Sequence, residues 1–302
     1  MLTQVGTVED SEMTGSELVR VIHKYDAIFM GLYPLLTADT LEKAAKLKAV
    51  ASVITNPVHI DVATAKARGI AILSLENELE LLNTITGTAE MSWCLLLDVV
   101  RSTPWAFEDV KSYHWEREKY RGHNLYWKTI GIFGFGRLGK WMARYARAFN
   151  MTVLACSPNL SAKECKEFSC RSVDLGTLLK ESDIIAIHAN LNTETKGIFN
   201  RATFKKMKSG MYIVNTADGE IVNEDDLIEA LEGGIVAGYG TDVLAGEMHF
   251  AEGFKSYRLI EYAKTHRNVI VTPHIGGMTH ESREATDIFL AKKLVEYVRS
   301  SS

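Results

Sequence analysis

The sequence is poor in the features that mark several large classes of protein. It has four cysteines and five prolines in 302 residues, and the cysteines show neither zinc-site spacing nor the density of a disulfide framework. A formal net charge of −4 gives no sign of a nucleic-acid partner. No apolar run is long enough to span a bilayer, and no secretory signal is visible. We therefore expect a cytoplasmic protein without a metal, a membrane or a nucleic-acid partner.

The composition is that of an ordinary globular protein. We expect the fold to be organised around one glycine-rich stretch. The length suits two domains. In residues 129–140 an apolar strand pattern runs into Gly134-x-Gly136-x-x-Gly139 and then into a helix pattern. This spacing is typical of a dinucleotide loop: the glycines allow a tight turn, close backbone approach to phosphates, and close packing of helix on strand. An ordinary strand-to-helix turn is the alternative, but the flanking elements favour a nucleotide site, with phosphate at the helix start.

The first 83 residues alternate between helix and strand patterns and form a small α/β layer without a phosphate loop. Apolar spacing and capping residues set the expected boundaries. The expected helices begin at Ser16 and span residues 40–48 and 61–68, and the expected strands are residues 27–30, 49–54 and 70–75.

A long apolar helix is expected from Thr88 to a break near Pro104. A helix that is apolar on most faces is either deeply buried or a subunit contact, and we favour the contact. After the glycine loop, strand patterns recur with helices between them, and Asn223 caps one of these helices. The expected strands are residues 151–156, 183–188, 211–215, 236–240 and 268–271.

This alternation predicts parallel strands joined by right-handed crossovers in a doubly wound sheet. Residues 84–277 are expected to form a dinucleotide-binding domain, and residues 1–83 with 278–302 a smaller α/β domain. The final helix is expected to return to the smaller domain. Its expected apolar face carries Ile288, Ala291, Leu294, Val295 and Val298.

Ligands bind at the carboxyl ends of the strands in such sheets, and four of these ends offer polar side chains. They are Ser157, residues 216–219, Asp242 and residues 272–274. His274 is the strongest catalytic candidate, because Pro273 fixes the backbone before it and the following glycines let the chain turn. We expect the other eight histidines to be structural.

Four motifs in this order and spacing resemble the D-isomer-specific 2-hydroxyacid dehydrogenases, the family that includes phosphoglycerate and formate dehydrogenases. The motifs are the glycine loop and residues 211–223, 240–247 and 272–277, and the resemblance covers nearly the whole chain. It implies a Rossmann-type cofactor domain inserted into a smaller flavodoxin-like domain, and a homodimer.

The resemblance also implies roles for individual residues. His274 is expected to be the general acid/base, a role typically worth about 10²- to 10⁴-fold in rate. Glu247 matches the carboxylate that bonds this histidine, which favours the protonated ring and fixes its tautomer. Asp242 matches an aspartate that contacts the nicotinamide end of the cofactor. The expected cofactor-binding residues are Gly134, Gly136, Arg137, Leu138, Gly139, Ser157, Thr216, Ala217, Asp242 and Gly276.

The chain departs from the family pattern at both places where the substrate carboxylate is held. The family's catalytic arginine lies in an Asn-x-Ala-Arg-Gly motif, and this chain has Asp218 at that position. In the first domain, where the family has a glycine-rich loop, Thr55 and Asn56 are followed by Pro57, which has no N–H to donate. Thr55, Asn56 and Asp218 are therefore expected to face a substrate that is not a simple 2-oxo acid.

The choice between NAD and NADP stays open. NAD-preferring members carry an aspartate for the ribose hydroxyls at the end of the second strand, and this chain has Ser157. Serine removes the charge that repels a 2′-phosphate, yet no arginine follows to attract one.

We hypothesise an NAD(P)-dependent oxidoreductase that acts on a CH–OH or C=O carbon, with Asp218 facing an amine or hydroxyls of the substrate. The alternative is a catalytically impaired NAD(H)-binding protein that serves as an interaction or sensor module. The altered anchors favour this alternative, and the retained His274 and Glu247 argue against it. A third interpretation is an acid-base or hydrolytic enzyme that uses bound NAD as a transient oxidant.

Overall fold

The computed structural model describes residues 1–55 and 57–300 and divides into two compact units. One unit comprises Met1–Ile85, Met248–Gly253 and Thr279–Ser302, and the other comprises Thr86–Glu247 and Phe254–Met278. Within the described ranges, no helix has both the length and the apolar character that crossing a membrane requires.

The first unit is built on a parallel sheet of three strands in the order β1-β2-β3. Its strands are β1 (Ala27–Met30), β2 (Ala49–Ser52) and β3 (Ala71–Leu73), and its helices are α1 (Gly15–Val21), α2 (Ala38–Lys43), α3 (Val62–Ala67), α4 (Leu79–Thr84) and α13 (His280–Ser300), with short 3-10 turns η1 (Leu2–Gln4) and η2 (Ile22–Lys24). Leu294 of α13 packs with Ala49 and Ala51 of β2, so the end of the chain completes this unit.

Helix boundaries in the first unit differ from the sequence prediction. The predicted cap at Ser16 is wrong, because Thr14 caps α1: its hydroxyl accepts the N–H of Glu17, whose carboxylate accepts the N–H of Thr14 in return. Helix α2 ends at Lys43 and not at residue 48, because Ala44 leaves helical geometry with a ψ of 66°.

The predicted apolar face of α13 is partly wrong. Ile288 is exposed, whereas Leu290, Leu294 and Val295 are buried. Leu290 packs beside Val53 and Leu75 in a separate cluster. The buried stripe therefore lies on the face that includes Leu290, which the sequence pattern did not select.

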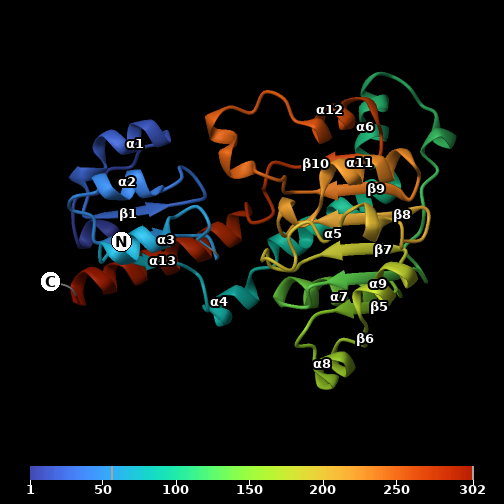
Figure 1. Cartoon of the computed structure of the whole chain (residues 1–302), viewed down its shortest axis with the longest axis horizontal. Coiled ribbons are helices and arrows are strands. Elements are labelled where there is room, and N and C mark those ends of the chain that lie inside the picture. Colours follow the sequence, from blue (N-terminus) through green and yellow to red (C-terminus); the bar gives the residue numbers. More distant parts are fainter. Residues whose placement is uncertain (56, 301–302) are drawn as a thin grey trace. The chain divides into compact units, whose positions relative to one another are not determined.

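The second unit contains a parallel sheet of seven strands in the order β10-β9-β8-β7-β4-β5-β6 (Figure 1). Its strands are β4 (Thr129–Phe133), β5 (Thr152–Cys156), β6 (Cys170–Ser172), β7 (Ile184–Ile187), β8 (Met211–Asn215), β9 (Val236–Thr241) and β10 (Val269–Val271). The chain builds β5 and β6 on one side of β4 and β7 to β10 on the other, so a topological switch point lies between β4 and β7. The predicted α/β fold with a doubly wound parallel sheet is confirmed.

Helices and short 3-10 turns connect these strands. They are α5 (Gly87–Arg101), α6 (Thr103–Lys111), η3 (Arg117–Tyr120), α7 (Arg137–Ala148), α8 (Ala162–Glu167), α9 (Leu175–Glu181), α10 (Arg201–Phe204), η4 (Gly219–Ile221), α11 (Glu224–Glu232), η5 (Glu247–Glu252) and α12 (Arg258–Thr265). Asn223 caps α11 as predicted, because its side chain accepts the N–H of Asp226.

The long apolar helix α5 is deeply buried within its own unit. Leu95, Leu96 and Val99 lie in the main core with strands of the large sheet, and a Cβ on Gly238 of β9 would lie 2.6 Å from Val99. Packing against the sheet thus accounts for much of its apolar character, and the interpretation as a subunit contact stays a prediction. The predicted break near Pro104 is confirmed: α5 ends at Arg101, Ser102 has a φ of +55°, and Pro104 lies in the first turn of α6, where proline is tolerated.

Candidate active site

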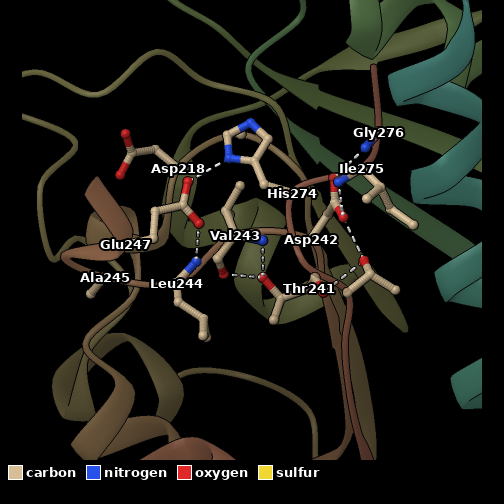
Figure 2. A network of polar contacts seen from close by, with 12 residues as sticks. Asp218, Thr241, Asp242, Val243, Leu244, Ala245, Glu247, His274, Ile275 and Gly276 are labelled. Carbon is tan, nitrogen blue, oxygen red and sulfur yellow. Dashed lines mark hydrogen bonds and ion pairs between the residues drawn. The ribbon is translucent and has the colours of Figure 1, made fainter. Parts of the chain in front are cut away.

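The carboxyl ends of three neighbouring strands bring together most of the predicted catalytic residues. Asp218 follows β8, Asp242 follows β9, and His274 follows β10. Because β8, β9 and β10 are adjacent and parallel, their ends meet at one edge of the sheet. Figure 2 shows the three side chains together with Glu247.

His274 and Glu247 form a close pair. His274 Nδ1 lies 2.5 Å from Glu247 Oε1, and because a carboxylate can only accept, Nδ1 donates. The other ring nitrogen, Nε2, points away from Glu247 (Figure 2). This hydrogen bond raises the pKa of His274 above its usual 6.5, and the charges of Glu247, Asp242 and Asp218 act in the same direction. The ring is half-exposed, so Nε2 is positioned to exchange a proton with a substrate.

The backbone that carries His274 is held by Asp242, which is 2% exposed. Asp242 Oδ1 accepts the N–H of Ile275 at 2.9 Å and the hydroxyl of Thr272 at 2.5 Å, and Oδ2 accepts the N–H of Gly276 at 2.6 Å. These bonds bracket His274, whose φ of +54° is unusual for a residue with a side chain. Asp242 therefore fixes the loop that carries His274, and its predicted contact with the cofactor stays a prediction.

Asp218 caps the 3-10 turn η4, because its Oδ1 accepts the N–H of Glu220 at 2.8 Å. The buried Asn215 supports the turn by donating its side-chain N–H to the carbonyl oxygen of Asp218 at 2.9 Å. Burial raises the pKa of Asp218, and the charges of Glu220 and Glu247 raise it further. In Figure 2 its carboxylate points away from the imidazole of His274.

The glycine loop has the geometry that its sequence predicts. Gly134 has a φ of +94°, and a Cβ there would lie 2.3 Å from the backbone nitrogen of Ala189. A Cβ on Gly139 would lie 2.3 Å from the carbonyl oxygen of Gly134, so helix and strand approach closely. Gly136 opens α7 as its N-cap, and nothing lies within 4 Å of a Cβ there. That open space beside the first free N–H groups of a helix fits the phosphates of a dinucleotide.

At the carboxyl ends of β7 and β8, two buried polar atoms have no hydrogen-bond partner among the described residues. They are Nδ1 of His188, which follows β7, and Oγ1 of Thr216, which follows β8. Burial lowers the pKa of His188 to about 4, so the ring is neutral at pH 7. Orphaned polar groups at the carboxyl edge fit a polar ligand that completes their hydrogen bonds. His188 is not among the residues predicted from the sequence, and its only signal there is its place directly after a strand.

The remaining predicted residues lie at or near strand ends. Ser157 follows β5, Ala217 lies in the turn after β8, and Arg137 and Leu138 form the first turn of α7; burial lowers the pKa of Arg137. Thr55 lies exposed beyond the end of β2 in the first unit, and Asn56 lies outside the described residues. The binding roles given to these residues stay predictions.

Comparison with known proteins identifies the family. The sequence model described as D-isomer specific 2-hydroxyacid dehydrogenase, NAD binding domain, matches residues 93–276. D-3-phosphoglycerate dehydrogenase of Bacillus subtilis (strain 168) is 34% identical over 278 residues, which are 92% of this chain and 50% of that protein. Glyoxylate reductase of Thermococcus litoralis is 32% identical over 289 residues, which are 93% of this chain and 83% of that protein.

A solved structure is also similar to this chain. D-lactate dehydrogenase from Aquifex aeolicus, crystallised with NAD and lactic acid, superposes with a TM-score of 0.81 at 28% identity, covering 93% of this chain and 85% of that one. The chain spans about half the length of the phosphoglycerate dehydrogenases that it matches. The matching family model describes an NAD-binding domain, and the Aquifex aeolicus enzyme was crystallised with NAD, so the predicted family resemblance is confirmed. The chain belongs to the D-isomer specific 2-hydroxyacid dehydrogenase family.

Proposed function

We propose that this chain is an NAD(P)-dependent oxidoreductase that interconverts a carbonyl and a CH–OH group, with His274 as the acid/base. The observation that carries the proposal is the His274–Glu247 pair, 2.5 Å apart, on the same sheet edge as the glycine loop. A pure cofactor binder has no need of a proton carrier at this place. The residues that would hold the cofactor are those of the loop, Gly134 to Gly139, with Thr216 and His188 at the neighbouring strand ends.

The chemistry divides between cofactor and protein. When bound, a reduced nicotinamide supplies a hydride to the carbonyl carbon. In that direction His274 gives the proton on Nε2 to the carbonyl oxygen, which becomes a hydroxyl, and the ring becomes neutral. Glu247 holds Nδ1–H and stabilises the charged ring before the transfer. In the reverse direction neutral His274 takes the proton.

We further propose that Asp218 occupies the position of the family's catalytic arginine. The match of residues 215–219 with the family's Asn-x-Ala-Arg-Gly motif supports this, as does the place of Asp218 after β8. An anion there repels a substrate carboxylate, whereas the arginine would bind it in a two-pronged contact. The substrate is therefore not a simple 2-oxo acid, and Asp218 recognises an amine or hydroxyl group through the oxygen that does not cap Glu220.

The finer properties of the whole protein belong to the same proposal. Ser157 leaves NAD and NADP both open as cofactors. Four free cysteines suit a reducing compartment, in keeping with a cytoplasmic location. A homodimer is supported by large exposed aromatic side chains between α6 and β4: Tyr113, Trp115 and Trp127 are 97%, 85% and 78% exposed. Aromatic side chains are enriched at protein interfaces relative to the rest of the surface.

A turnover screen with a pH series tests the function. NADH and NADPH oxidation is followed across 2-oxo acids, aldehydes, ketosugars and amino-substituted carbonyl compounds. We expect reduction to be fastest below the raised pKa of His274 and to fall above it, because Nε2 must carry a proton; oxidation of the product should show the opposite trend. Cofactor binding without turnover of any compound would favour the impaired binding module instead.

A further inference from the structure

In the loop that carries Glu247, both backbone polar groups of Ala245 are bonded by side chains from other elements. The backbone N–H of Ala245 donates to Glu224 Oε1 at 3.1 Å, and its carbonyl oxygen accepts the Tyr257 hydroxyl at 2.9 Å. Glu224 is the first residue of α11, and Tyr257 is the N-cap of α12. Two helices that are separate in sequence thus hold both polar groups of one residue.

The opposite side of this loop lies against the turn that follows β8. A Cβ on Gly219 would lie 2.1 Å from the carbonyl carbon of Leu244 and 2.2 Å from the backbone nitrogen of Ala245. Leu244 in turn donates its N–H to Glu247 Oε2 at 3.0 Å. The segment is therefore enclosed between Gly219 on one side and the Glu224–Tyr257 pair on the other, and its position sets that of the Glu247 carboxylate.

Glu224 and Tyr257 also contact each other. Burial raises the pKa of Glu224, while the hydrogen bond with Tyr257 and that with Ala245 act against this. Burial, followed by the contact with Glu224, raises the pKa of Tyr257. The half-buried carboxyl of Glu224 and phenol of Tyr257 hold the N–H and the carbonyl oxygen of the same residue. Moving Ala245 away would cost free energy, because each side chain would lose a hydrogen-bond partner.

We propose that Glu224 and Tyr257 are positioning residues that hold Glu247 against His274 by clamping Ala245. Neither touches the imidazole. Glu224 bonds Ala245, and the same loop donates the N–H of Leu244 to Glu247, so we expect an effect of Glu224 on His274 to pass through the loop. The kinetic consequence rests on the proposed function, but the positioning itself can be measured without a substrate.

The test is an NMR titration of the His274 imidazole in the full chain, with its signal assigned by its loss in His274→Gln. Glu224→Ala removes the acceptor for Ala245, Glu224→Gln keeps an acceptor oxygen, and Tyr257→Phe removes the hydroxyl. Glu247→Gln serves as the reference for complete loss of the partner charge. The matched control is Asp225→Ala, because Asp225 is the next residue of α11 and pairs with Arg258. Together with Glu224, Ala245 and Tyr257 it lines a cavity of about 520 Å³.

We expect the His274 pKa to fall toward 6.5 in Glu224→Ala and, by a smaller amount, in Tyr257→Phe, and to stay at the wild-type value in Glu224→Gln and Asp225→Ala. An unchanged His274 pKa in Glu224→Ala would overturn the proposal, and so would an equal fall in Glu224→Gln, which would indicate charge and not position. If Glu224→Ala does not fold, Tyr257→Phe decides alone. Because no substrate is needed, this result is independent of the turnover screen.

Discussion

Replacement of His274 by alanine is expected to reduce turnover by about 10²- to 10⁴-fold, the usual value of a positioned proton-transfer group. Cofactor affinity should stay within about twofold, since the glycine loop supplies the phosphate contacts. Steady-state kinetics on the substrate found in the screen, with calorimetric titration of NADH, measures both quantities. The expected signature is a loss in kcat with cofactor binding retained.

Two further variants sharpen this result. His280→Ala removes an exposed imidazole at the start of α13 and should leave turnover unchanged. Glu247→Gln keeps an acceptor for the N–H of Leu244 but removes the charge beside His274, so the pH at which reduction falls should move down. Full turnover in His274→Ala would show that another group carries the proton.

Replacement of Asp218 by arginine is expected to give the largest gain on simple 2-oxo acids. A donor aimed at developing charge is worth about 3 to 4 kcal/mol, so kcat/KM on these acids should rise by about 10²- to 10³-fold, while use of the native substrate weakens.

Asp218→Asn is the matched control, because asparagine can still accept the N–H of Glu220 and keep the cap on η4. It removes the repulsion without adding a two-pronged donor, and its gain should lie between the wild type and arginine. Thermal melting checks that each variant folds. If Asp218→Arg is inert on every 2-oxo acid although folded, position 218 does not govern substrate choice.

Much of the fold follows from local sequence patterns. Where the prediction from sequence fails, the cause is also local. Strand β8 occupies the predicted residues 211–215 because a continuous apolar run ends at a polar turn. Strand β6 was not predicted, because its three residues, Cys170–Ser172, are half-buried or exposed at the sheet edge and carry no apolar signal. Helix α2 ends early, at Lys43, and Leu47 beyond it is buried. Tertiary packing of this segment overrides the helix propensity of its residues.

The candidate site, like the fold, follows only in part from the sequence. Placement of His274, Asp242 and Asp218 at adjacent strand ends follows from the order of strands in a parallel sheet. The clamp on Ala245 does not, because Glu224 and Tyr257 come from different helices and neither forms a motif with the other. Nor does the sequence reveal that both carboxylate oxygens of Asp242 accept hydrogen bonds from the loop that carries His274.

The role of His274 is tested most sharply by a crystal structure of the full chain with bound NADH. We expect the pyrophosphate on the N-terminus of α7 over Gly136, and the nicotinamide at the carboxyl ends of β8 to β10 with His274 Nε2 facing its reactive side. A nicotinamide bound elsewhere, or an imidazole turned away from it into the protein, would contradict the assignment of His274 as the acid/base.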